Sequence, residues 1–149
     1  MKNFPDLPPL WTLAAFAVSW LFAQFLPFGK LPSFGVQLLG LAWIVLAVLL
    51  ILWSVLYFRA NKTTIEPHHT PTALITKGPY RISRNPIYLA MVVASIGWAL
   101  WCGTLSAFVG PVILAWVLHN RFVLPEEAKL REAFGAKAEA YITKTKRWV

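Results

Sequence analysis

The uncharged stretch from Ile87 to Leu118, IYLAMVVASIGWALWCGTLSAFVGPVILAWVL, decides how this chain folds. As one helix, its thirty-two residues would be about 48 Å long, well beyond the roughly 30 Å hydrocarbon core of a bilayer. The WCGT sequence at residues 101–104 offers a turn in the middle. We therefore predict a hairpin of two membrane-spanning helices, over residues 86–102 and 105–124.

Two further uncharged segments precede the hairpin, at residues 10–28 and 34–58. Each is long enough to cross a bilayer as a helix, and a short turn rich in proline and glycine separates them. A signal peptide is the alternative for the first segment, but no cleavage site of small residues follows it. Residues 59–86 are polar and basic, so we expect them to form a water-facing loop.

The composition supports a membrane protein. Hydrophobic residues make up 58% of the chain and charged residues 13%, against roughly 45–50% and 25% in ordinary soluble domains. The net charge is +8, and in so apolar a chain a basic excess indicates membrane orientation before nucleic-acid binding. With a single cysteine, an internal disulfide and a thiolate metal cluster are both excluded. We expect membrane lipids as partners, with no nucleic acid and no metal.

The distribution of lysine and arginine selects four spans over three. With four spans, thirteen of the fourteen cations share the side of the two termini, and Lys30 alone lies opposite. Three spans would place the basic C-terminal tail outside, against the positive-inside rule. We therefore expect an inner or plasma membrane location with both termini cytoplasmic.

The tail beyond the fourth span has the pattern of one more helix, over residues 125–145. Pro125 suits a first helical position, and Glu126 and Glu127 suit the positive end of the helix dipole. Leu130 and Phe134 fall near one face, so the helix is amphipathic. The predicted fold is a single all-α integral membrane domain, residues 1–149, with four transmembrane helices and a C-terminal cytoplasmic amphipathic helix. The alternative for the tail is a simple lipid anchor.

The densest group of candidate site residues is KGPYRISRNPIY, at residues 77–88. Asn85 followed by Pro86 is a helix-start pattern, with Asn as the N-cap and Pro at the first position. The free N–H groups of such a helix start, together with Arg84, can bind a carboxylate or phosphate. Equally, Lys77 and the arginines of this segment could simply touch lipid headgroups.

A second group, His119 and Arg121 with Glu126 and Glu127, follows the fourth span. In the predicted topology it lies on the same side of the membrane as residues 77–88. Ionisable groups near membrane depth usually face the interior of a bundle and mark function. Two carboxylates facing two arginines would be able to hold a zwitterion.

Together, the two groups resemble the integral-membrane methyltransferases that include isoprenylcysteine carboxyl methyltransferase and the phospholipid N-methyltransferases. The matching residues are Gly78-Pro79-Tyr80, Arg84-Asn85-Pro86 and Tyr88, then Glu126-Glu127, Leu130, Phe134-Gly135, Tyr141 and Arg147-Trp148. They occur in the family's order, around the predicted hairpin, from about Thr64 to Trp148. Asn85 stands where the eukaryotic branch commonly has histidine.

The resemblance implies S-adenosylmethionine (SAM) as the methyl donor, a pocket closed by the tail, and a lipophilic acceptor that enters from the bilayer. It places at or near the cofactor Gly78, Pro79, Tyr80, Arg84, Asn85, Pro86, Tyr88 and Glu127. We add Lys77, which directly precedes this motif.

The chemical nature of the acceptor stays open at this point. A carboxylate acceptor, as in isoprenylcysteine, needs an orienting cation, for which Arg147 and Arg121 are candidates. A phospholipid amine must first lose a proton, which requires a base such as Glu126, Glu127 or His119. The sequence contains both sets.

Two other interpretations compete with a methyltransferase. Membrane sterol reductases share a related motif and use NADPH, although the 2′-phosphate of that cofactor calls for more basic residues than this loop provides. The other is a small non-enzymatic membrane protein that binds a partner. The three interpretations differ in which ligand should stabilise the protein against unfolding: SAM for a methyltransferase, NADPH for a reductase, and neither for a non-enzymatic protein.

Overall fold

The computed structural model describes residues 6–60 and 74–149, so residues 61–73 of the polar loop expected at 59–86 lie outside them. The described chain is helical, with one isolated β-bridge between Lys30 and Thr104. Its α-helices are α1 (Pro8–Phe25), α2 (Ser33–Ala60), α3 (Pro86–Cys102), α4 (Val109–Leu118), α5 (Leu124–Phe134) and α6 (Ala136–Lys144). Short 3-10 helices η1 (Gly78–Arg81) and η2 (Leu105–Phe108) and the π-helix η3 (His119–Val123) connect them.

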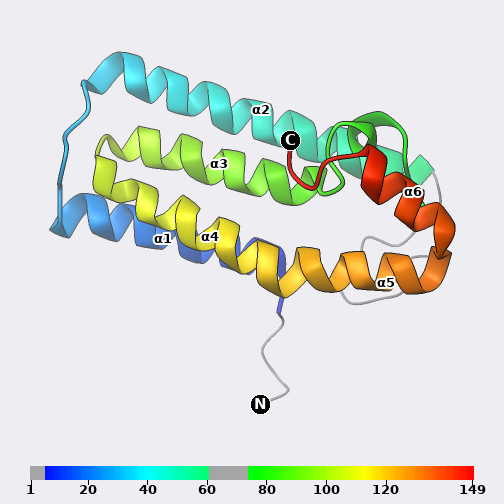
Figure 1. The fold of residues 1–149 in the computed structure, drawn as a ribbon. Coiled ribbons are helices and arrows are strands. Elements are labelled where there is room, and N and C mark those ends of the chain that lie inside the picture. Colours follow the sequence, from blue (N-terminus) through cyan, green and yellow to red (C-terminus); the bar gives the residue numbers. More distant parts are fainter. Residues whose placement is uncertain (1–5, 61–73) are drawn as a thin grey trace.

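The long helices lie side by side as a bundle (Figure 1). Helix α3 packs against α1, α2 and α4, and α1 also packs against α4. The stretches Phe34–Ala60 and Leu105–Phe134 are long and apolar enough to cross a membrane, while Pro86–Cys102 is a shorter apolar helix. At one end of the bundle α5 continues the direction of α4, and α6 turns back toward the start of α3 (Figure 1).

Helices α2 and α3 approach each other closely at two glycines. A Cβ atom on Gly40 would lie 2.5 Å from the carbonyl oxygen of Gly97, and one on Gly97 would lie 2.6 Å from that of Gly40. Neither position has room for a larger residue unless the helices move apart. This contact fixes how α2 lies on the helix that begins at the candidate site.

The turn of the hairpin lies where the sequence predicts it. Helix α3 ends at Cys102, and Gly103 follows with a φ of 73°, a left-handed conformation that glycine adopts without steric cost. The backbone N–H of Leu31 donates to the Gly103 carbonyl at 2.9 Å, and that of Leu105 donates to Gly29 at 3.0 Å. The loop between α1 and α2 is thereby tied to this turn.

Three helix boundaries differ from the predicted ones. Helix α1 ends at Phe25 rather than residue 28, before the Pro27 turn. The fourth helix does not stop at residue 124, because the wide turn of η3 accommodates Pro125, which lacks an N–H, and the helix runs on to Phe134. In place of one tail helix over 125–145 there are two, since Gly135 has φ 50° and ψ −125° and breaks it.

Candidate functional site

The carboxylate of Glu127 is the centre of a buried polar network at the end of the bundle where α5 begins. Glu127 is 2% exposed. Its two oxygens accept hydrogen bonds of 2.8 Å from Nε and Nη2 of Arg147, and Nη2 of Arg84 lies 3.0 Å from Oε1. A bidentate guanidinium–carboxylate pair is among the strongest polar contacts in proteins. One carboxylate therefore holds together α5, the C-terminal segment and the short segment that precedes α3.

The C-terminal segment after α6 lies across the start of α3. The backbone N–H of Arg84 donates to the Lys146 carbonyl at 3.0 Å, and the Asn85 side-chain amide donates to the Arg147 carbonyl at 3.0 Å. The Ser83 hydroxyl donates to the same carbonyl at 3.3 Å. Asn85 does precede α3, but its side chain does not cap the helix, because its amide is used to hold the C-terminal segment.

Two tyrosines join η1 to α6. The Tyr141 hydroxyl donates to the Tyr80 carbonyl at 2.6 Å, and the Tyr80 ring packs edge-on against Phe58. Burial raises the pKa of Tyr141 to about 12, and burial together with the nearby Tyr141 and Glu126 also raises the pKa of Tyr80. Both phenols are therefore protonated at neutral pH and able to donate hydrogen bonds.

The tight turn into η1 depends on glycine. Gly78 has a φ of 60°, and a Cβ atom there would lie within 3 Å of the Tyr57 ring on α2. Pro79, the next residue, is fully buried. This turn places Tyr80 over the start of α3.

Two buried polar atoms of the site have no hydrogen-bond partner within the described part of the chain. They are the Tyr80 hydroxyl oxygen and Nε of Arg84. Buried donors are almost always satisfied in proteins, so such atoms indicate a place for a ligand or a water molecule. The other two nitrogens of the Arg84 guanidinium are satisfied, by the Ile142 carbonyl at 2.6 Å and by Glu127.

Glu126 belongs to the site by a separate contact. The Tyr88 hydroxyl donates to its Oε1 at 2.5 Å, and the Tyr88 ring lies against Phe122 in the apolar core beneath the site. Adjacent glutamates on one helix thus have different partners. Glu127 pairs with two arginines, while Glu126 accepts a hydrogen bond from a neutral phenol and also interacts electrostatically with Lys129.

The structure brings most of the predicted site residues together and separates two of them. The network or its immediate surroundings contain Gly78, Pro79, Tyr80, Arg84, Asn85, Pro86, Tyr88, Glu126, Glu127 and Arg147. His119 lies beside the Trp148 ring at 6.4 Å, at the edge of this group. Lys77 is exposed. Arg121 points elsewhere, since it pairs with Asp6 at 2.9 Å and lies over the Trp11 ring.

The expected arrangement of two carboxylates facing two arginines is therefore only half present. One acid, Glu127, meets both Arg84 and Arg147. Ser83 and the carbonyls of the C-terminal segment also take part in the network, although the sequence does not predict it. Main-chain carbonyls carry no sequence signal, and the short serine side chain in a basic loop has none that distinguishes it.

The comparisons with known proteins support the resemblance seen in the sequence. The model of the phospholipid methyltransferase (PEMT) family matches residues 36–137, more than half of the chain and the part that runs from α2 into α6. This chain belongs to the phospholipid methyltransferase family. The family match ends before Tyr141 and Arg147, so it covers the α3 start and Glu127 but not the C-terminal segment that binds them.

Two individual proteins are similar to this chain. An uncharacterized protein of Haemophilus influenzae is 30% identical over 63 residues, which are 42% of this chain and the whole of that protein. The structure of the eukaryotic intramembrane Ras methyltransferase ICMT (isoprenylcysteine carboxyl methyltransferase) matches 97% of this chain with a TM-score of 0.67 at 18% identity. The match covers 52% of ICMT, so the chain spans about half the length of that protein and shares its fold.

Proposed function

We propose that this protein is a membrane-embedded methyltransferase that moves a methyl group from SAM to a lipophilic acceptor. Membership of the phospholipid methyltransferase family and the ICMT-like fold support the reaction class. In this proposal all four apolar segments cross the inner or plasma membrane as one domain. Both termini lie on the cytoplasmic side, as does the network around Glu127.

The observation that carries the proposal is the pair of unpartnered buried donors on Tyr80 and Arg84. Both belong to the segment that leads into α3, a helix of 17 residues. SAM has a carboxylate and ribose hydroxyls, which suit donors of this kind, and an ammonium group, which suits a carboxylate such as Glu126. When bound, SAM would supply an electrophilic methyl group on a positively charged sulfur.

The remaining residues would position and enclose the cofactor. Glu127 fixes the direction of the Arg84 guanidinium through their 3.0 Å contact, so that Nε is held in place. The C-terminal segment, bound to Ser83 and Asn85, would close the site against water. Methyl transfer needs little covalent help from a protein, so such positioning is the main contribution.

The contacts favour an amine over a carboxylate as the acceptor. A carboxylate would need an orienting cation, but Arg147 is engaged with Glu127 and Arg121 with Asp6. An ammonium headgroup must release a proton before its nitrogen can accept a methyl group. Glu126, whose Oε1 accepts the hydrogen bond of the Tyr88 hydroxyl, would be the carboxylate that takes that proton.

Removal of a single hydroxyl group tests whether SAM binds at this site. Tyr80→Phe removes an unpartnered buried hydroxyl, so the variant should fold at least as stably as the natural protein. Its affinity for SAM, measured by calorimetry on the full chain in detergent micelles, should fall about threefold to tenfold, the usual value of one neutral hydrogen bond. Arg81→Ala is the control, because Arg81 is exposed and lies outside the network.

The outcome separates the competing functions. Unchanged SAM affinity in Tyr80→Phe would remove the site assignment. Binding of NADPH in place of SAM would indicate a reductase, and binding of neither would indicate a non-enzymatic membrane protein. Membranes incubated with SAM carrying an isotopic label in its methyl group, followed by mass spectrometry of the lipids, would identify the acceptor. Label on a carboxylate rather than an amine would contradict the role given to Glu126.

A further inference from the structure

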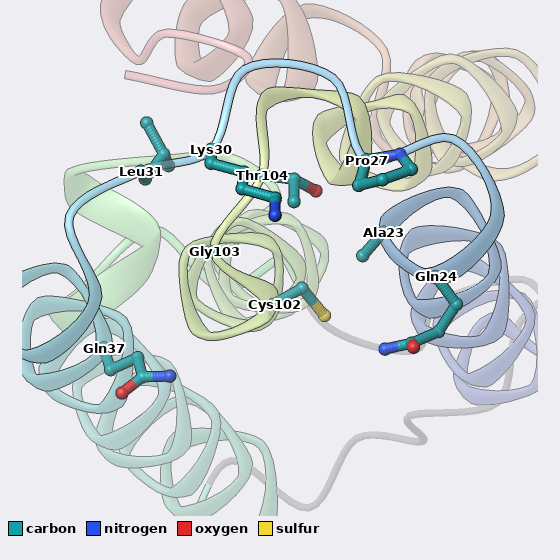
Figure 2. Close-up of a pocket in the computed structure, with 9 residues that line it drawn as sticks. All are labelled: Ala23, Gln24, Pro27, Lys30, Leu31, Gln37, Cys102, Gly103 and Thr104. Atoms are coloured by element: carbon teal, nitrogen blue, oxygen red, sulfur yellow. The ribbon is translucent and has the colours of Figure 1, made fainter.

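A polar hollow lies at the end of the bundle opposite the Glu127 network, where α1 leads into α2 and α3 turns into η2 (Figure 2). It has a volume of about 420 Å³ and is open to the surroundings. Four of its lining side chains can donate hydrogen bonds: Gln24 from α1, Lys30 from the loop, Gln37 from α2 and Thr104 from the turn. With α3 being 17 residues long, this hollow lies about 25 Å from the Glu127 network.

The frame of the hollow is built from backbone hydrogen bonds and is therefore rigid. Lys30 pairs with Thr104 in the isolated bridge, and Leu31 and Leu105 donate across to the opposite segment. Gly29, next to Lys30, has a φ of 66°, a conformation strained for other residues. A cation held on such a frame is positioned before any ligand arrives.

The sequence segments that form this end of the bundle contain no aspartate or glutamate near Lys30. It is the only charged residue between Asp6 and Arg59, and no charged residue occurs from Asn85 to Asn120. Those two stretches form α1, α2, the hairpin and their connecting loops. Among the residues that the structure describes at this end, no carboxylate is available to neutralise Lys30, and an anion from outside is the natural partner.

The surroundings of the hollow are strongly apolar. The rings of Phe25, Phe28 and Phe34, in and beside the same loop, are 74%, 76% and 74% exposed. Large exposed rings beside a membrane-spanning helix suit the interface with lipid. The site thus combines a cationic, amide-rich centre with an apolar border, which matches an amphiphile that has an anionic headgroup.

We propose that this hollow binds the phosphate group of a phospholipid, with Lys30 as the charged contact and Gln24 and Gln37 as amide donors. The acyl chains lie along the exposed rings. Because the hollow is at the other end of α3, this lipid is not the methyl acceptor but a bound structural lipid. The inference does not depend on the methyltransferase function.

The test compares a lipid that has a phosphate group, the corresponding lipid without it, and phosphate alone. The full chain in uncharged detergent micelles is titrated with dioctanoyl phosphatidic acid, with dioctanoylglycerol and with inorganic phosphate. We expect Lys30→Gln to bind phosphatidic acid about tenfold more weakly, the loss of one charge-assisted hydrogen bond. Lys30→Arg, which keeps the charge, and Lys137→Gln, an exposed lysine on α6, should bind as the natural protein does. Thermal melts verify that each variant is folded.

Several results would overturn the proposal. Equal affinity of the natural protein and Lys30→Gln for phosphatidic acid would show that the lipid binds only at the basic end. Dioctanoylglycerol binding as tightly as phosphatidic acid would show that the phosphate is not recognised. The ligand would be the free ion if inorganic phosphate bound the natural protein as tightly as the lipid does and bound Lys30→Gln more weakly.

Discussion

The two ends of the bundle are held together by different kinds of hydrogen bond. Around Glu127, side chains from α5, from the α3 start and from the C-terminal segment bind one another and nearby carbonyls. At the loop end, backbone groups of residues 28–31 pair with those of residues 103–106. One end therefore depends on the identity of particular side chains, whereas the other depends on the shape of the main chain.

This difference shows where the molecule can do chemistry. Backbone pairing builds a stiff frame but leaves few side-chain groups to titrate or to exchange partners. Side-chain pairing places charged groups in a buried position, which is costly unless every partner is present. Four experiments test the contrast, from the largest expected effect to the smallest.

Removing the central charge should have the largest effect. Glu127→Gln leaves the Arg84 guanidinium, whose side chain is 8% exposed, without its counter-charge. Breaking one partner of a buried pair typically costs about 3–5 kcal/mol, so we expect a loss of that size in the free energy of unfolding, measured by denaturant titration in micelles. Glu132→Gln, on the exposed side of α5, is the control and should be neutral. Equal stability of both variants would show that the network is not essential for folding.

Removing the C-terminal segment should have the next largest effect. Deletion of residues 145–149 removes three hydrogen bonds from the start of α3 and also removes Arg147 from Glu127. At about 1 kcal/mol for each neutral bond, SAM affinity should fall on the order of a hundredfold or become unmeasurable by calorimetry. Deletion of Val149 alone should leave it unchanged. A shortened chain that inserts and binds SAM normally would make this segment a simple anchor.

At the loop end, a pair of glycines separates main-chain strain from crowding. Gly29→Ala places a Cβ atom 2.6 Å from the Leu105 side chain at a φ of 66°, whereas Gly103→Ala meets nothing within 4 Å at a φ of 73°. We expect a loss of roughly 1–2 kcal/mol in Gly103→Ala from the left-handed conformation alone, and a larger loss in Gly29→Ala. Thermal melts of both variants measure the difference. Equal melting temperatures would mean that Leu105 moves aside freely.

The smallest effect is expected at Arg121. Its ion pair with Asp6 is on the surface, with side chains 52% and 31% exposed, and such pairs contribute less than about 1 kcal/mol. Arg121→Gln should therefore change neither stability nor SAM affinity measurably. A tenfold loss of SAM affinity in this variant would return Arg121 to the site and weaken the argument for an amine acceptor.

The elements that the sequence predicts best are those set by local chemistry. Pro86 fixes the start of α3, and Gly103 fixes the turn of the hairpin, because each residue has a strong conformational preference of its own. It was also predictable that Arg84 and Glu127 lie at the same end of the bundle. Two apolar segments, the two arms of the hairpin, separate them in the sequence, so the chain returns to the end from which it started. The family resemblance, which was built on these motifs, is confirmed.

The contacts that could not be predicted depend on the direction in which a side chain points once the chain is folded. The sequence groups Arg121 with Glu126, but η3 changes the helical pitch between them, and Arg121 reaches Asp6 instead. The pattern at Asn85 is that of an N-cap, yet its amide finds the Arg147 carbonyl because the C-terminal segment passes there. Neither event has a local signal.

The π-helix η3 also affects how the length of this chain can vary during evolution. A wide turn of this kind is equivalent to one additional residue inserted into an α-helix, and it absorbs that residue locally. Losing one residue between His119 and Val123 would therefore restore regular α-helix with nearly the same orientation of α5 relative to α4, and Glu127 would still face its two arginines. The same deletion would remove the wide turn that accommodates Pro125, whose ring meets the carbonyl four residues earlier in a regular helix. The wide turn and Pro125 are therefore expected to be kept or lost together.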